Sequence, residues 1–345
     1  MDQEVMSVNK REDWVDFTKA ILIFLVIIGH VIQYFYCSGK DYWNNLIFLF
    51  IYSFHMPLFS LLSGYLFRLH GGKHGLIDSV KRRFMQIIVP CFAWASINYF
   101  LQVIIGRIDI ISVSLGSFVK YWMNSNWFLW AMFYCACAML ICISMKDYRY
   151  VAMFAFIIIN FVTPDWTNLI GYKMMLPFFV VGYIMHDFIE HLESPQIRTC
   201  DRQMYSVILG GGIVCLLFLK KTDVMVWECS ALNDLNTATL FIRKFILNGT
   251  VCFFALGLIK ILSMISVKGF KKIGRETLGI YMVQTFVFEN FSGKFVISNS
   301  WSLVGKSFAV IIISVFILSV SYGIVKMLRT RSITNKILLG AFEFK

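Results

Sequence analysis

Titratable side chains occur inside long apolar runs of this sequence, where burying a charge is costly and a polar group usually has a function. The first run contains His30, and Lys19 precedes it by eleven residues. At 100° per residue, eleven steps come to about 20° beyond three helical turns, so both side chains share one face, roughly 16 Å apart. Asp16 lies near the same face, three residues before Lys19. Since imidazole titrates near neutral pH, His30 is a candidate general base behind a cation. The structural alternative is a snorkelling lysine and a hydrogen-bonded histidine.

The second apolar run carries another histidine, His55, followed by Pro57, which cannot donate a backbone hydrogen bond. Ser60 and Gly64 form a small-x-x-x-small pair that favours close packing against another helix. A basic cluster, 81–83, then precedes the third run. Its Arg82 and Arg83 would bind phosphates or, alternatively, anchor the cytoplasmic end of a membrane span.

Three further polar or aromatic residues are candidates for contact with a substrate. Trp127 opens the fourth apolar run, where it is either an interfacial anchor or a surface for stacking a sugar ring. Gln284 and Glu289 lie within the ninth run, and Glu289 needs a partner or water at that depth.

The composition identifies the element that must position these residues. Hydrophobic residues make up 58% of the 345-residue chain and charged residues only 15%, against roughly 25% charged in soluble domains. So much apolar surface does not fit in one soluble core, which excludes a soluble enzyme and a disordered chain. The net charge of +12 comes from short loops, so the sequence predicts no nucleic-acid binding. The 9 cysteines form no C-x-x-C pair, and no metal site is predicted.

We therefore predict an all-α, polytopic membrane protein with about ten transmembrane helices, each an apolar run long enough to cross the bilayer. The predicted spans are 17–37, 45–67, 84–106, 127–145, 149–163, 171–188, 204–220, 239–265, 277–297 and 303–328.

Loop charges predict the orientation. With the N-terminus inside, about 20 basic residues face the cytoplasm and about 10 face outside, which places both termini in the cytoplasm. Connections are short throughout, so residues 1–345 are predicted to form a single integral membrane domain with a cytoplasmic tail at 329–345. The first run is long enough to span and lacks a small-residue cleavage site, so no signal peptide is predicted.

Several segments together resemble the membrane acyltransferase family 3, and within it the subgroup related to fucose 4-O-acetylase. That family has Arg or Lys, ten residues and then His in its first span, which Lys19 and His30 match. The resemblance extends from about residue 12 to residue 290, and departs from the family pattern at Gln86, often basic, and at Gln284, often His. The segments that carry it are 14–19, 26–30, 54–66, 81–90, 126–130, 176–183 and 273–281.

The resemblance implies an enzyme that O-acylates carbohydrate in a bacterial cytoplasmic membrane. The donor would be cytoplasmic acetyl-CoA or a related acyl-CoA, and the acceptor a sugar of a surface polysaccharide or of its lipid-linked oligosaccharide precursor.

The expected mechanism gives each candidate a role. His30 takes the proton from the sugar hydroxyl, or becomes acylated itself, and His55 orients the acceptor or replaces His30 as base. Lys19, held by Asp16, joins Arg82 and Arg83 in binding the phosphates of CoA. The acceptor would contact Trp127, Gln284 and Glu289. The rival interpretation is a transporter of a sugar or lipid-linked glycan, which also has many spans and intramembrane charges.

Overall fold

A computed structural model describes residues 13–37, 40–70, 75–163, 170–192, 210–214, 217, 220–224, 235–263, 268–291, 297 and 301–343. These residues form helices and connecting segments with no strand, which confirms the all-α prediction. The α-helices are α1 (Asp13–Val31), α2 (Leu46–His70), α3 (Leu76–Arg83), α4 (Val89–Ile104), α5 (Leu115–Asn124), α6 (Trp127–Ser144), α7 (Arg149–Val162), α8 (Ile170–Leu192), α10 (Lys221–Val224), α11 (Leu235–Ser263), α12 (Lys268–Gly274), α13 (Thr277–Phe291), α14 (Leu303–Arg329) and α15 (Ser332–Leu339).

Six helical segments within the described ranges are long and apolar enough to cross a membrane: Asp13–Tyr36, Leu46–Leu69, Leu76–Ile104, Trp127–Ser144, Asn236–Ser263 and Leu303–Arg329. They coincide with six of the ten predicted spans. Three more predicted spans correspond to α7, α8 and α13, of which α7 and α13 have only 14 and 15 residues. The span predicted at 204–220 lies mostly outside the described residues. The number of ten and the orientation therefore stay predictions.

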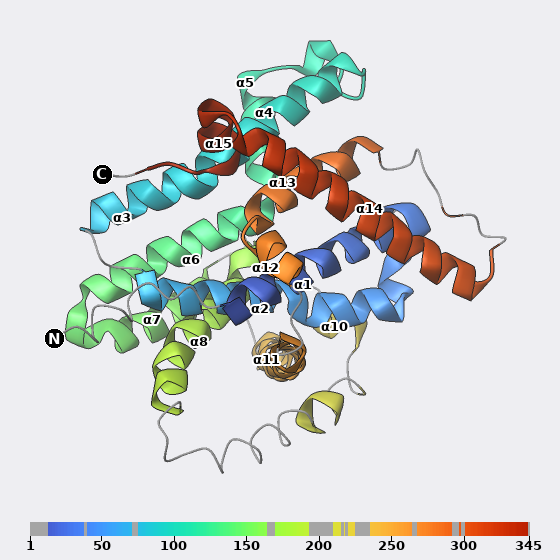
Figure 1. Cartoon of the computed structure of the whole chain (residues 1–345). Coiled ribbons are helices and arrows are strands. Elements are labelled where there is room, and N and C mark those ends of the chain that lie inside the picture. Colours follow the sequence, from blue (N-terminus) through green and yellow to red (C-terminus); the bar gives the residue numbers. More distant parts are fainter. Residues whose placement is uncertain are drawn as a thin grey trace.

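The helix α1 lies in the interior of the bundle, in contact with α2, α11, α12, α13 and α14 (Figure 1). It runs parallel to α13, because residues further along the α1 segment contact residues further along the α13 segment. Asp16 meets Arg275, His30 meets Gln284, and the Phe35 ring meets the Phe288 ring. A parallel pair requires an odd number of crossings between the two helices, and the ten-span prediction provides seven.

Close helix crossings are made by small residues, as predicted for Ser60 and Gly64. The Ser60 hydroxyl donates to the Met175 carbonyl at 2.7 Å. A Cβ on Gly64 would lie 1.9 Å from the Phe179 carbonyl oxygen, and one on Gly182 would lie 1.9 Å from that of Leu61. The backbones of α2 and α8 therefore touch, which only glycine at both positions permits.

Two stretches of π-helix interrupt the regular helices beside candidate residues. One, Ile32–Tyr36, follows the end of α1 and begins two residues after His30. The other, Phe84–Ile88, follows Arg83 and ends just before Pro90, which lacks the N–H that a regular turn requires. Such wide turns are frequent at functional sites because they redirect side chains within a helix.

The segment predicted as a tail contains the short helix α15, which lies beside α4 (Figure 1). The Trp94 indole donates to the Leu338 carbonyl at 3.1 Å. Gly340, with a φ of 68°, ends α15 so close to the π-helical stretch before α4 that a Cβ there would lie 2.2 Å from the Gln86 carbonyl oxygen. Residues after α14 are thus packed against the bundle.

Candidate functional site

His30 is held by a chain of hydrogen bonds that starts on α13. The Thr285 hydroxyl donates to the Tyr281 carbonyl at 2.8 Å, and the Gln284 amide nitrogen donates to the Thr285 oxygen at 3.0 Å. This order turns the Gln284 amide oxygen toward His30 Nδ1, 2.9 Å away. Since an amide oxygen only accepts, Nδ1 carries the proton and Nε2 keeps its lone pair. His30 therefore has the tautomer that a general base at Nε2 requires.

Two aromatic rings flank the half-buried His30 imidazole. The Phe288 ring meets it edge-on at 5.2 Å, and the Tyr34 ring lies at 6.0 Å and stacks on Phe288. Gly29 leaves room for Tyr52, whose ring would be 2.7 Å from a Cβ at that position.

His55 also packs against Tyr52, and the centres of the two rings are 4.6 Å apart. The side chain is buried, and Nδ1 donates to the Ile51 carbonyl at 2.7 Å. A carbonyl oxygen also only accepts, so His55 has the same tautomer as His30, with Nε2 unprotonated. Tyr52 thus packs against His55 and against Gly29, the residue before His30.

The N-terminal part of α1 contains the predicted pair of Asp16 and Lys19. Their side chains are 3.4 Å apart, as expected for positions three residues apart on a helix. The sequence did not predict a second cation, Arg275, which lies 3.1 Å from Asp16. Gly274 allows this contact, since a Cβ there would lie 1.7 Å from the Asp16 carbonyl oxygen. Asp16 is 2% exposed, so two cations compensate one buried carboxylate.

Arg82 and Arg83 lie on a different helix from Lys19. They lie on α3, which packs against α6 and the π turn that follows it. The Arg83 guanidinium lies 5.4 Å from the centre of the Phe67 ring. The cations predicted to bind CoA phosphates therefore lie on two helices: Lys19 on α1, and Arg82 and Arg83 on α3.

Trp127 is the first residue of α6 and follows Asn126, which has the left-handed φ of 53°. The Trp127 ring is half-buried beside Phe128, whose ring lies 6.3 Å from that of Tyr281. The aromatic start of α6 is thus connected to the region of α13 that holds Gln284. Gln284 itself is fully buried, and its amide oxygen accepts the hydrogen bond of His30. Gln284 therefore holds that histidine in position.

Glu289 lies at the far end of α13 within a polar network that includes α4 and α5. Its carboxylate accepts hydrogen bonds from the Asn98 amide and from the Tyr121 hydroxyl, the latter at 3.0 Å. Burial, then the charge of Glu289, raises the pKa of Tyr121 above its usual value, so the phenol stays protonated and donates. Asn290 donates to Asn98 at 2.7 Å, and Arg107 donates to the Glu289 carbonyl at 2.7 Å. These are the partners that the sequence analysis required for Glu289.

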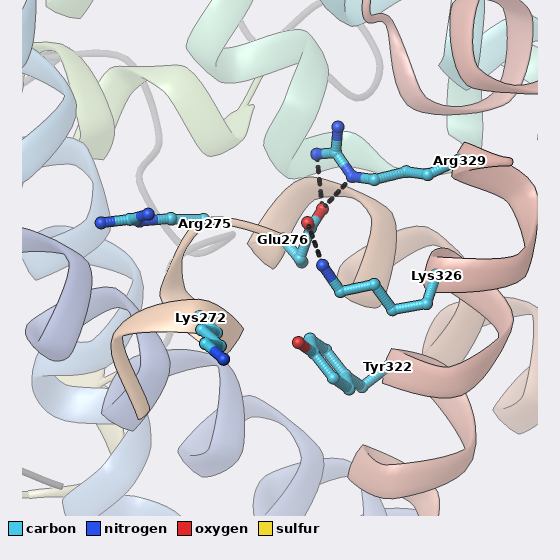
Figure 2. A pocket seen from close by; sticks show the side chains of 6 residues that line it. All are labelled: Lys272, Arg275, Glu276, Tyr322, Lys326 and Arg329. Carbon is cyan, nitrogen blue, oxygen red and sulfur yellow. Dashed lines mark hydrogen bonds and ion pairs between the residues drawn. The ribbon is translucent and has the colours of Figure 1, made fainter. Parts of the chain in front are cut away.

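A pocket of about 540 Å³ lies at the other end of α13 (Figure 2). Lys326 and Arg329, from α14, reach the Glu276 carboxylate at 3.3 Å and 2.5 Å. Arg275 points away from that carboxylate. The sequence analysis treated these cations only as a sign of orientation, although Tyr322, Lys326 and Arg329 recur at helical spacing. The lining residues are Lys272, Arg275, Glu276, Tyr322, Lys326 and Arg329.

Among the described residues, no group of three or more His, Cys, Asp or Glu side chains could hold a metal ion. The site as described consists of one organising helix, α13, with Glu276 just before it, Gln284 in its middle and Glu289 near its end.

Comparisons with known proteins show the family. The model of acyltransferase family 3, described as "Acyltransferase domain", matches residues 12–325. The chain is similar to the nodulation protein NolL of Mesorhizobium japonicum, with 36% identity over 127 residues, or 36% of this chain and 34% of that protein. To NolL of Sinorhizobium fredii it is 27% identical over 222 residues, which are 61% of this chain and 58% of that protein. The matched parts thus cover less than two thirds of either relative, and no solved structure matches.

The family match covers most of the chain, including the first-span pair of Lys19 and His30 and most of α13. The helices long and apolar enough to cross a bilayer agree with a multi-pass membrane protein. The chain therefore belongs to the membrane acyltransferase family 3.

Proposed function

We propose that this acyltransferase moves an acetyl or similar acyl group from acyl-CoA to a hydroxyl of a surface polysaccharide or of its lipid-linked precursor. The observation that supports this proposal most is the hydrogen-bond chain from Tyr281 to His30, because it leaves Nε2 of a half-buried histidine unprotonated. A transporter would not require a fixed tautomer, and family membership favours acyl transfer.

In the proposed reaction, His30 Nε2 takes the proton of the acceptor hydroxyl as its oxygen attacks the thioester carbonyl. The tetrahedral intermediate then expels the CoA thiolate, and the protonated imidazole returns the proton to that sulfur. The product is an O-acyl ester and free CoA. A variant forms an acyl-imidazole on Nε2 first, and the acceptor then attacks that carbonyl.

His55 is the second candidate base in this proposal, because its Nε2 is also unprotonated and its ring packs on Tyr52, which lies against Gly29 next to His30. In the proposed arrangement, Lys19 binds a phosphate of the donor and Asp16 positions Lys19. Arg82 and Arg83 contribute further positive charge from α3. Trp127 and the Glu289 network are proposed to contact the acceptor.

The proposed location is a bacterial cytoplasmic membrane, with the N-terminal end of α1 facing the cytoplasm. In this orientation Lys19 lies at the side where acyl-CoA occurs, and His30 lies roughly 16 Å further along the helix. An extended pantetheine arm is long enough for that separation, so the nucleotide would stay on the cytoplasmic side.

The test uses membrane vesicles that contain the parent chain or His30→Ala, with acetyl-CoA labelled in the acetyl group and a lipid-linked glycan acceptor. Loss of a general base lowers acyl transfer by about 100- to 10,000-fold. We expect this loss for His30→Ala and near-parental labelling for His186→Ala, a control histidine on α8 outside the site. Retained labelling in His30→Ala together with loss in His55→Ala would move the base to α2.

A further inference from the structure

The pocket between α12 and α14 contains more positive charge than its internal pairs use. Four cations line it, and Glu276 is the one carboxylate among the lining residues. Glu276 is buried and accepts from both Lys326 and Arg329. The net charge of the lining residues is therefore +3. A site with this excess favours a ligand that carries more than one negative charge.

Several hydrogen-bond donors in the pocket are unused. Arg329 gives Nε and Nη2 to the same Glu276 oxygen, at 2.7 Å and 2.5 Å, which leaves Nη1 available. Within the part of the chain that the structure describes, Lys272 has no hydrogen bond or ion pair, and the Tyr322 hydroxyl has no hydrogen-bond partner. Glu276 thus acts as a brace that orients two cations and keeps some of their donors free.

We infer that this pocket binds a phosphate ester, with Lys272, Lys326, Arg329 and Tyr322 as its donors. A phosphate monoester carries a charge of about −1.5 to −2 near pH 7 and presents three acceptor oxygens, which suits an excess of positive charge with spare donors. The volume of about 540 Å³ exceeds that of one phosphate group and leaves room for the atoms that the ester joins.

The position favours the acyl-CoA donor as the source of this phosphate, an assignment that rests on the proposed function. Arg275 both lines the pocket and pairs with Asp16, so the pocket is next to the pair of Asp16 and Lys19 on α1. Glu276 precedes Gln284 by eight residues, which is about 12 Å along α13. A donor with its 3′-phosphate here would point its thioester toward the level of His30.

An anionic lipid headgroup also presents a phosphate ester, in phosphatidylglycerol a diester with one negative charge. Exposed apolar residues of α14 next to the pocket, among them Met327, would face such lipids. The test therefore has two arms, and both use the full chain in nanodiscs made of neutral phosphatidylcholine. The variant is Lys272→Ala, which removes an exposed cation without breaking an ion pair. The matched control is Lys271→Ala on the same helix, whose Asp13 partner is 58% exposed, so that pair contributes little.

The first arm measures the Kd of CoA and of 3′-dephospho-CoA by titration calorimetry. We expect the parent and Lys271→Ala to bind CoA about tenfold more tightly than 3′-dephospho-CoA, and Lys272→Ala to reduce that ratio to about twofold. The second arm measures the rise in melting temperature when phosphatidylglycerol is included in the nanodisc. A rise that depends on Lys272, with an unchanged CoA ratio, would assign the phosphate to a lipid.

The inference is overturned when Lys272→Ala changes neither the CoA ratio nor the response to phosphatidylglycerol. That result would leave the proposed function intact as long as the parent still binds CoA. If neither CoA nor 3′-dephospho-CoA binds the parent, the proposed donor is wrong, and the lipid arm alone decides whether the pocket binds phosphate.

Discussion

The hydrogen bond between Gln284 and His30 predicts a specific defect when it is removed. Gln284→Leu keeps the approximate volume of the side chain but offers no acceptor to Nδ1. The bond is 2.9 Å long and Gln284 is fully buried, so the lost acceptor is not replaced by water. Leaving such a donor unsatisfied costs about 1–3 kcal/mol. The imidazole avoids this cost by moving its proton to Nε2, the atom proposed to take the proton of the acceptor.

If that cost appears in the transition state, kcat falls by about 5- to 150-fold. The KM for acetyl-CoA should stay near that of the parent, because Gln284 does not line the proposed donor pocket. The assay follows the release of CoA thiol by the purified chain in nanodiscs, with the acceptor found in the vesicle experiment. Gln284→Glu should recover much of the rate, since a carboxylate oxygen also accepts from Nδ1.

Thr285→Val is the matched control, because it removes the next link of the chain and leaves the Gln284 amide in place. We expect it to lower kcat less than fivefold. A Gln284→Leu variant with kcat within twofold of the parent, while His30→Ala is inactive, would refute the assignment of Gln284 as the residue that fixes the tautomer.

Two further predictions concern the packing and the far end of α13. Gly64→Ala places a methyl group 1.9 Å from the Phe179 carbonyl oxygen, so we expect α2 and α8 to separate. The free energy of unfolding should fall by about 1–3 kcal/mol or more, measured as a lower melting temperature. Gly323→Ala, with open space around it, should have no such effect. Glu289→Leu leaves the Tyr121 hydroxyl without its acceptor, so it should lower stability by about 1–3 kcal/mol and raise the KM for the acyl acceptor. Glu289→Gln, which still accepts a hydrogen bond, should stay near the parent in both measurements.

The sequence predicted what depends on spacing within one helix. Asp16 and Lys19 are in contact because positions three apart on a helix are neighbours. The small face of Ser60 and Gly64 was predicted to pack closely, and it does. Long apolar runs likewise predicted helices, since the period and length of such runs are local properties.

Contacts between distant segments were not predictable from one sequence. Gln284 and His30 are 254 residues apart, and spacing along the chain gives no sign that they meet. The pairing of Arg275 with Asp16 depends on how closely α12 approaches α1, which Gly274 permits only once both helices are in place. The pocket cations were visible as charges, but loop charges in membrane proteins also set orientation, so their convergence on Glu276 had no separate signal.

The packing of α15 on α4 has a consequence for how the protein is made. The Trp94 indole and the Leu338 carbonyl are 244 residues apart, so α4 is synthesised and inserted long before its partner exists. Until α15 arrives, the Trp94 indole lacks this bond, and the π-helical stretch before α4, which Gly340 approaches, stays uncovered. Membrane insertion of the early helices and completion of their packing are therefore separate events in time. A ribosome that stalls before residue 332 would leave these helices inserted but without α15, and quality-control proteases could recognise the surface that α15 normally covers.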